Sequence, residues 1–165
     1  MLDIEDWAIS GMATIVVARK HVSENLTFGV YLVDLMCLGV KKTIFKYNAP
    51  EKDLQRIHQN AISQNIMFEE VPYELVHNII YSAIEYAEKY GFSPVSDFTL
   101  VTQYILEEDT EAIPLIHIHC GDENGQPMYI DTGVYSPTQT KRTLEQLEKT
   151  AGSGNYHYFN GMNYY

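Results

Sequence analysis

Cysteines, basic residues and long apolar runs are all scarce in this 165-residue chain. The two cysteines, Cys37 and Cys120, are too few for a disulfide framework and are typical of a reducing compartment. No run reaches the roughly 18 apolar residues of a transmembrane helix, so we expect no membrane association. With 22 acidic and 11 basic residues the net charge is -11, which excludes a general affinity for phosphates, so we expect no nucleic-acid partner.

The first residues also lack the basic and apolar regions of a secretory signal, and we therefore expect a cytoplasmic protein. The residues that are present form an ordinary globular composition, with 45% hydrophobic and 20% charged residues. The length suits one domain. We predict a single domain over residues 1–152, followed by a tail over residues 153–165 that is rich in Gly, Asn and Tyr.

Two strands are predicted in the first third of the chain. Thr14–Ala18 is a β-branched run, which favours a strand. The near-continuous apolar run over residues 28–41 predicts a central strand covered on both faces, which ends or bends between Leu35 and Gly39. The lysines that follow, at positions 41, 42 and 46, are interpreted as the solvated face of a helix.

Helical spacing of apolar residues dominates the middle of the chain. We predict a helix capped by Asn48, a long helix over residues 73–90, and a third helix capped by Ser96. The turn signal Asn124-Gly125 then predicts a hairpin between strands at 115–120 and 128–131, and Ser136-Pro137 opens a last helix. The order strands–helices–hairpin–helix predicts an α+β fold with a mixed or mostly antiparallel central sheet.

Asp34 is the first candidate site residue because it is a carboxylate in the middle of the apolar run. A buried and unpaired carboxylate has a raised pKa, which suits a general acid or base. The alternative is a structural anchor, in which Asp34 bonds backbone amides or pairs with Lys41 or Arg19. We favour the anchor.

His117 and His119 are the second candidate, because positions i and i+2 of a strand share a face and the pair could bind one metal. With Glu123 they spell H-x-H-x-x-x-E, which resembles part of the first metal motif of cupins but lacks its flanking glycines and the second motif. Two histidines bonded within a sheet are the alternative. Either cysteine could be a nucleophile only in an electropositive, partly exposed setting, and both neighbourhoods are apolar.

Standard phosphate-binding, dinucleotide-binding and nucleophile-elbow motifs are absent, so we expect no cofactor. Tyr73, His77 and Tyr81 form a line at helical spacing, which is typical of the edge of a packed helix. The aromatic tail could dock another protein. Packing of Tyr156 to Phe159 onto the domain is the alternative that we favour.

Several segments resemble an uncharacterised family of bacterial proteins: GMATIVVARKH, FGVYLVDLMCLGVKKTIF, HCGDENGQPMYIDTG and KRTLEQLEKTAGSGNYHYF. The stretch VDxxCLGVK, Val33 to Lys41, is the most specific part. The resemblance implies a bacterial cytoplasmic origin and no established activity. It also implies that Asp34, Cys37, Gly39 and Lys41 form one local unit, associated with the segment Gly121 to Gly133.

Two hypotheses of function follow. The favoured one is a non-enzymatic interaction or accessory module with a protein partner, because the chain is acidic, ends in aromatic residues and carries no recognised catalytic constellation. The alternative is a small hydrolase that uses Asp34, Lys41 and His119 as catalytic residues, with His117 nearby. The enzyme hypothesis requires that Asp34 and the two histidines open onto one cleft.

Overall fold

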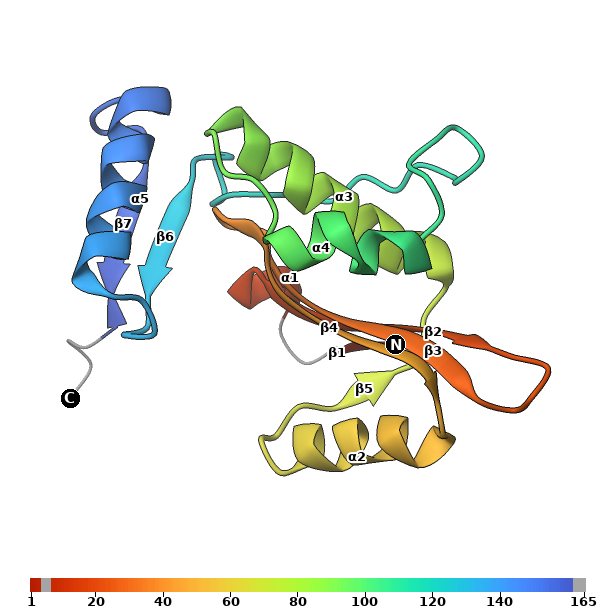
Figure 1. Cartoon of the computed structure of the whole chain (residues 1–165). Helices are drawn as coiled ribbons and strands as arrows, with labels where there is room; N and C mark the ends of the chain where they lie inside the picture. The colour runs from red at the N-terminus through yellow and green to blue at the C-terminus, as the bar shows by residue number, and fades with distance from the viewer. Residues whose placement is uncertain (4–6, 162–165) are drawn as a thin grey trace.

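The computed structural model describes residues 1–3 and 7–161, and it has an α+β fold. An antiparallel five-stranded sheet in the order β4-β3-β2-β1-β5 lies between helices on its two faces (Figure 1). Its strands are β1 Leu2–Asp3, β2 Met12–Lys20, β3 Leu26–Asp34, β4 Gly39–Ala49 and β5 Phe68–Glu69. The helices are α1 Trp7–Ser10, α2 Glu51–Ile62, α3 Tyr73–Lys89, α4 Ser96–Leu100, the 3-10 helix η1 Thr102–Ile105 and α5 Pro137–Thr150.

Strand β3 is an interior strand between β4 and β2 and is covered on both faces, as the apolar run predicts. Tyr31 and Val33 face α3 and belong to the main core, together with buried residues of that helix such as Ile79 and Ile80. Phe28 points to the opposite face, where it packs with apolar side chains of α2. Because successive side chains of a strand alternate between faces, Asp34 lies on the α2 face with Phe28.

The strand ends at Asp34, and a turn over residues 35–38 leads into β4 at Gly39, so the predicted end of the strand is confirmed. Gly39 has a φ of +68°, which favours glycine. A Cβ at this position would lie 3.1 Å from the carbonyl oxygen of Ala83. The turn therefore packs closely against α3.

Strand β4 contradicts the helix-face interpretation of Lys41, Lys42 and Lys46, which all lie on this edge strand. An edge strand is half solvated, so lysines between β-branched and aromatic residues are compatible with it. The predicted cap is also wrong, because Asn48 lies within β4 at a φ of +46°. Helix α2 begins after Pro50, without a side-chain cap.

Helix α3 agrees with the prediction and buries a continuous apolar stripe against the sheet. The third predicted helix is shorter than expected. Ser96 is its first residue rather than its cap, which is Val95, and the chain turns into η1 after Val101. Together α4 and η1 cover the same sheet face as α3, near β4 (Figure 1).

The predicted hairpin does not form. Residues 115–120 are extended but belong to no strand of the described chain, whereas the predicted turn exists, with the Asp122 amide donating to the Gln126 carbonyl at 2.8 Å. Strand β6 Met128–Asp131 pairs instead in parallel with β7 His157–Asn160. Both sides of the turn bond instead to the residues after β3, since the Gly121 amide donates to the Leu35 carbonyl and the Met128 amide donates to the Met36 carbonyl.

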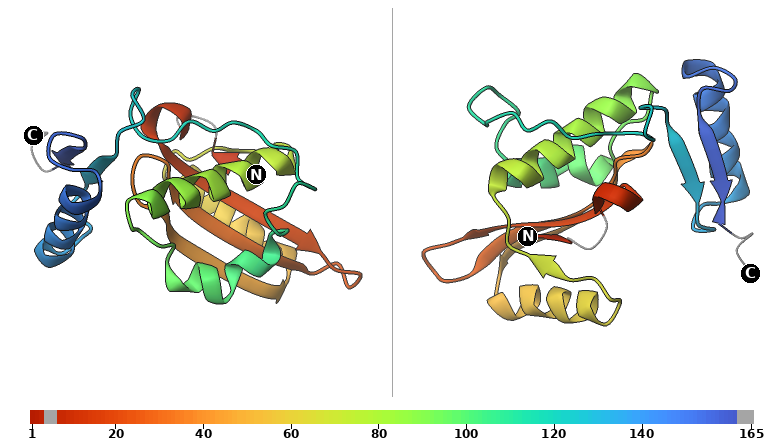
Figure 2. Two further views of the ribbon diagram at one scale, coloured as in Figure 1. Left: turned by 90° about the horizontal axis from the view of Figure 1, so that it is seen from above. Right: turned by 180° about the vertical axis from the view of Figure 1, so that it is seen from behind.

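The C-terminal elements form a separate layer at one end of the sheet (Figure 2). Helix α5 starts with a capping box between Ser136 and Gln139. Packing of Tyr156 to Phe159 onto the domain is confirmed, because β7 pairs with β6 and the Tyr158 ring stacks on Tyr129 with centroids 5.7 Å apart. The last two tyrosines of the tail lie outside the described residues.

Candidate functional site

Asp34 stabilises the turn that follows β3. Its Oδ1 atom accepts the backbone N–H groups of Met36 at 2.9 Å and Cys37 at 3.1 Å. The residue is only 5% exposed, and this burial raises the pKa of its carboxyl above the usual value, with nearby Lys41 and the backbone donors opposing the shift. The contacts agree with the anchor that the sequence favours.

Asp34 and Lys41 also line one cleft of about 360 Å³, between the end of the sheet and strand β6. Lys41 is an extra residue in β4, because Leu32 pairs with Lys42 and Val33 with Val40. Such a bulge redirects a side chain. The Lys41 ammonium lies 5.2 Å from the centroid of the Tyr135 ring, in the loop after β6, at a distance that favours a cation–π contact.

His117 and His119 are both exposed and share one side of their segment, as their spacing predicts. They line two further cavities, and neither histidine lines the cleft of Asp34 and Lys41. The Nε2 atom of His119 lies 2.6 Å from the Asp122 carbonyl oxygen. Across residues 1–3 and 7–161, no three His, Cys, Asp or Glu side chains gather in a way that could hold a metal ion.

Burial outweighs the nearby lysines in the setting of both cysteines. Cys37 is fully buried, and desolvation raises the pKa of its thiol far above the ordinary value. Partial burial raises the pKa of Cys120 to about 11. Both thiols are therefore protonated at neutral pH, which disfavours the thiolate that a nucleophile requires.

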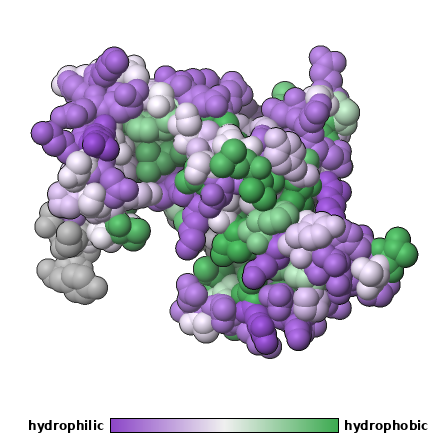
Figure 3. Space-filling model, in the orientation of Figure 1, coloured by the Kyte–Doolittle hydropathy of each residue, from purple (hydrophilic) through white to green (hydrophobic). Residues whose placement is uncertain are grey.

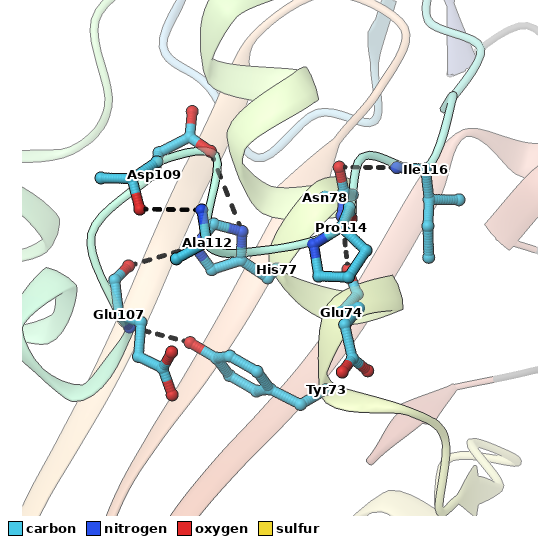
Figure 4. Close-up of polar contacts among 10 residues, drawn as sticks. Tyr73, Glu74, His77, Asn78, Glu107, Asp109, Ala112, Pro114 and Ile116 are labelled. Carbon is cyan, nitrogen blue, oxygen red and sulfur yellow. Dashed lines mark hydrogen bonds and ion pairs between the residues drawn. The ribbon is translucent and has the colours of Figure 1, made fainter.

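Of the line Tyr73, His77 and Tyr81, the first two contact the loop that follows η1 (Figure 4). His77 is 1% exposed, and its Nε2 atom lies 3.1 Å from the Glu107 carbonyl oxygen. The Tyr73 hydroxyl accepts the Glu107 amide at 2.8 Å. These contacts attach the loop after η1 to α3, as expected for the edge of a packed helix.

The feature that sequence reasoning missed is an exposed apolar surface around β4. Phe45 and Tyr47 of β4 line a groove of about 660 Å³. Three side chains from the end of α4 and from η1 also line this groove, and the surrounding face is apolar (Figure 3). Those three side chains are Leu100, Val101 and Tyr104. The β-branched and aromatic residues Thr43, Ile44 and Phe45 are the signal that could have identified the strand.

Comparison of the chain with protein-family models, with curated proteins and with solved structures found no match in any of the three. None of the described helices combines the length and apolarity needed to cross a membrane.

Proposed function

We propose that the protein is an interaction module that binds an extended segment of a partner protein along the outer edge of β4. One observation carries the proposal: β4 is an 11-residue strand with a neighbour on one side only within the described chain, and exposed apolar side chains flank it. An open edge offers unpaired N–H and C=O groups to an added strand. Among those backbone groups, the Val40 carbonyl is occupied, since it accepts the Val95 amide at 3.1 Å.

The two faces of β4 define the chemistry of the partner. Lys42, Ile44 and Lys46 pair with β3 residues of the α2 face, so two exposed cations lie on that side. Thr43 and Phe45 lie on the other side, beneath α4 and η1. Cross-strand pairs of opposite charge and of apolar residues stabilise a sheet. The matching segment alternates acidic with apolar residues.

The same charges disfavour a second copy of this chain as the partner. Strand β4 carries three lysines and no acidic residue, although the whole chain has a net charge of -11. Two β4 edges side by side would bring lysines together, and like charges across strands are destabilising. Lysines on an edge commonly prevent self-association. Here they also select an acidic segment.

The hydrolase alternative gains less support from the geometry. It requires Asp34, Lys41 and His119 on one cleft, and only the first two share one. The aromatic tail as the docking site also gains less, because Tyr156 to Asn160 are engaged with α5 and β6. We therefore assign the partner to β4.

The test is titration of the full chain with an end-blocked synthetic peptide in which Glu alternates with Val. We expect saturable binding, and the double variant Lys42→Glu with Lys46→Glu should weaken it roughly tenfold or more, since each reversed cross-strand pair changes by up to about 1 kcal/mol. The same double variant should improve binding of the matched peptide with Lys in place of Glu.

Two controls make the result specific. Lys141→Glu with Lys149→Glu changes the net charge equally on α5, away from β4, and should leave the affinity unchanged. The Glu-Val peptide methylated at every backbone amide should not bind, since neither of its edges can donate hydrogen bonds to β4. Equal affinity for the wild type and the β4 double variant would contradict the proposal.

A further inference from the structure

The cleft beside Asp34 is a separate feature on the opposite side of the sheet from the apolar groove of β4. Its volume of about 360 Å³ lies in the range of small-molecule sites. One wall is the end of the sheet and the turn after β3, with Met12, Leu32 and Met36, and the other is formed by Met128 and Ile130 of β6. The walls are therefore mainly apolar.

Three of these wall residues are methionines: Met12, Met36 and Met128. The methionine side chain is unbranched and flexible, and its thioether is polarizable, so such walls adapt to apolar ligands of different shape. All three are partly exposed, so the cleft walls are accessible rather than sealed core.

The charged groups of the cleft differ in the hydrogen bonds and ion pairs that they already make. Asp34 already accepts two backbone N–H groups through Oδ1. Lys41 and Lys42 are accessible, and among the described residues neither has a carboxylate oxygen within the 4.0 Å of an ion pair. Two cations against one engaged carboxylate leave an excess of positive charge beside an apolar wall.

We propose that this cleft binds a small amphipathic anion, a free carboxylate with a medium-length apolar chain. The carboxylate group lies between Lys41 and Lys42, where lysines act as charged hydrogen-bond donors. The chain lies along the methionines. The site shares Lys42 with the proposed peptide site at β4 but uses neither Phe45 nor the groove beside η1, so the binding of octanoate and the binding of the peptide are measured separately.

The test compares octanoate with 1-octanol and octylamine, which share the chain length but differ in the polar group, by calorimetric titration of the full chain. Octanoate should bind saturably at millimolar concentration or below, and at least tenfold more tightly than either analogue. Equal binding of 1-octanol and octanoate would overturn the role of the lysines, and absence of octanoate binding would overturn the site.

Matched variants locate the site. Lys41→Gln with Lys42→Gln should weaken octanoate at least tenfold, whereas Lys46→Gln, on the same strand but outside the cleft, should not. Ile130→Trp should block the cleft, because Ile130 is 37% exposed and its replacement enters the cleft without disturbing a core. Unchanged octanoate affinity in both altered proteins, with the fold verified by circular dichroism, would refute the proposal.

Discussion

The Asp34 carboxylate stabilises the turn between β3 and β4, and its burial there removes it from water. Removal of a charged group from water is expensive, and two backbone N–H donors compensate part of that cost. The raised pKa means that the folded protein holds the Asp34 proton more tightly than the unfolded chain does. The contribution of this group to stability is therefore present at low pH and is lost as pH rises through the raised pKa.

Two substitutions of Asp34 should distinguish the effect of its charge on stability from the effect of its hydrogen bonds. Asp34→Asn retains an acceptor for the two amides and cannot ionise, so its free energy of unfolding should increase relative to the wild type as pH rises from 4 to 7. Asp34→Ala leaves both amides without their acceptor and should lose about 1–3 kcal/mol. Urea unfolding at several pH values measures both. A variant Asp34→Asn that is as unstable as Asp34→Ala at pH 7 would contradict the anchor.

The face that Asp34 occupies could be predicted, because the period of a strand places it with Leu32. Its hydrogen-bond partners could not be predicted, since they depend on the turn at residues 35–38. The spacing of His117 and His119 correctly indicated a shared side. The distance from that side to Asp34 depends on the path of a loop, which no local pattern encodes.

At the scale of elements, α3 was the most predictable because one long apolar stripe determines it. Strand β4 was missed because lysines interrupt its apolar pattern, and only the pairing with β3 makes that pattern a strand. The hairpin prediction failed for a related reason. The turn at Asp122 is local and forms, but β6 pairs with a strand that begins 26 residues after Asp131, and no turn signal reports such a partner.

Asn78 is the residue that attaches the extended segment before the turn to α3. Its side-chain amide donates to the Pro114 carbonyl at 3.0 Å and accepts the Ile116 amide at 3.1 Å (Figure 4). Asn78→Ala should cost about 1–3 kcal/mol of unfolding free energy and should accelerate hydrogen exchange at Ile116. Asn60→Ala, at an exposed position of α2, is the control. Equal effects of the two substitutions would contradict this role.

At the scale of the molecule, the distribution of charge over the surface matters more for the choice of partner than the net charge does. A net charge of -11 argues against acidic partners, but at physiological salt the field of a surface charge is screened over about 8 Å. Strand β4 concentrates three lysines beside exposed apolar side chains, so this face differs in sign from the average surface. Large exposed apolar patches mark interaction surfaces, because monomeric soluble proteins rarely expose them. The β4 edge is therefore the part of the molecule that we assign to recognition.

The most direct test of the proposed function is amide hydrogen exchange of the full chain with and without the alternating Glu-Val peptide. Outward-facing amides of β4 between Lys42 and Lys46 should exchange more slowly when the peptide is present, because an added strand takes up their hydrogen bonds. Amides of β5, at the other edge of the sheet, should be unaffected. Peptide binding that protects β5 or β7 and leaves β4 unchanged would contradict the account.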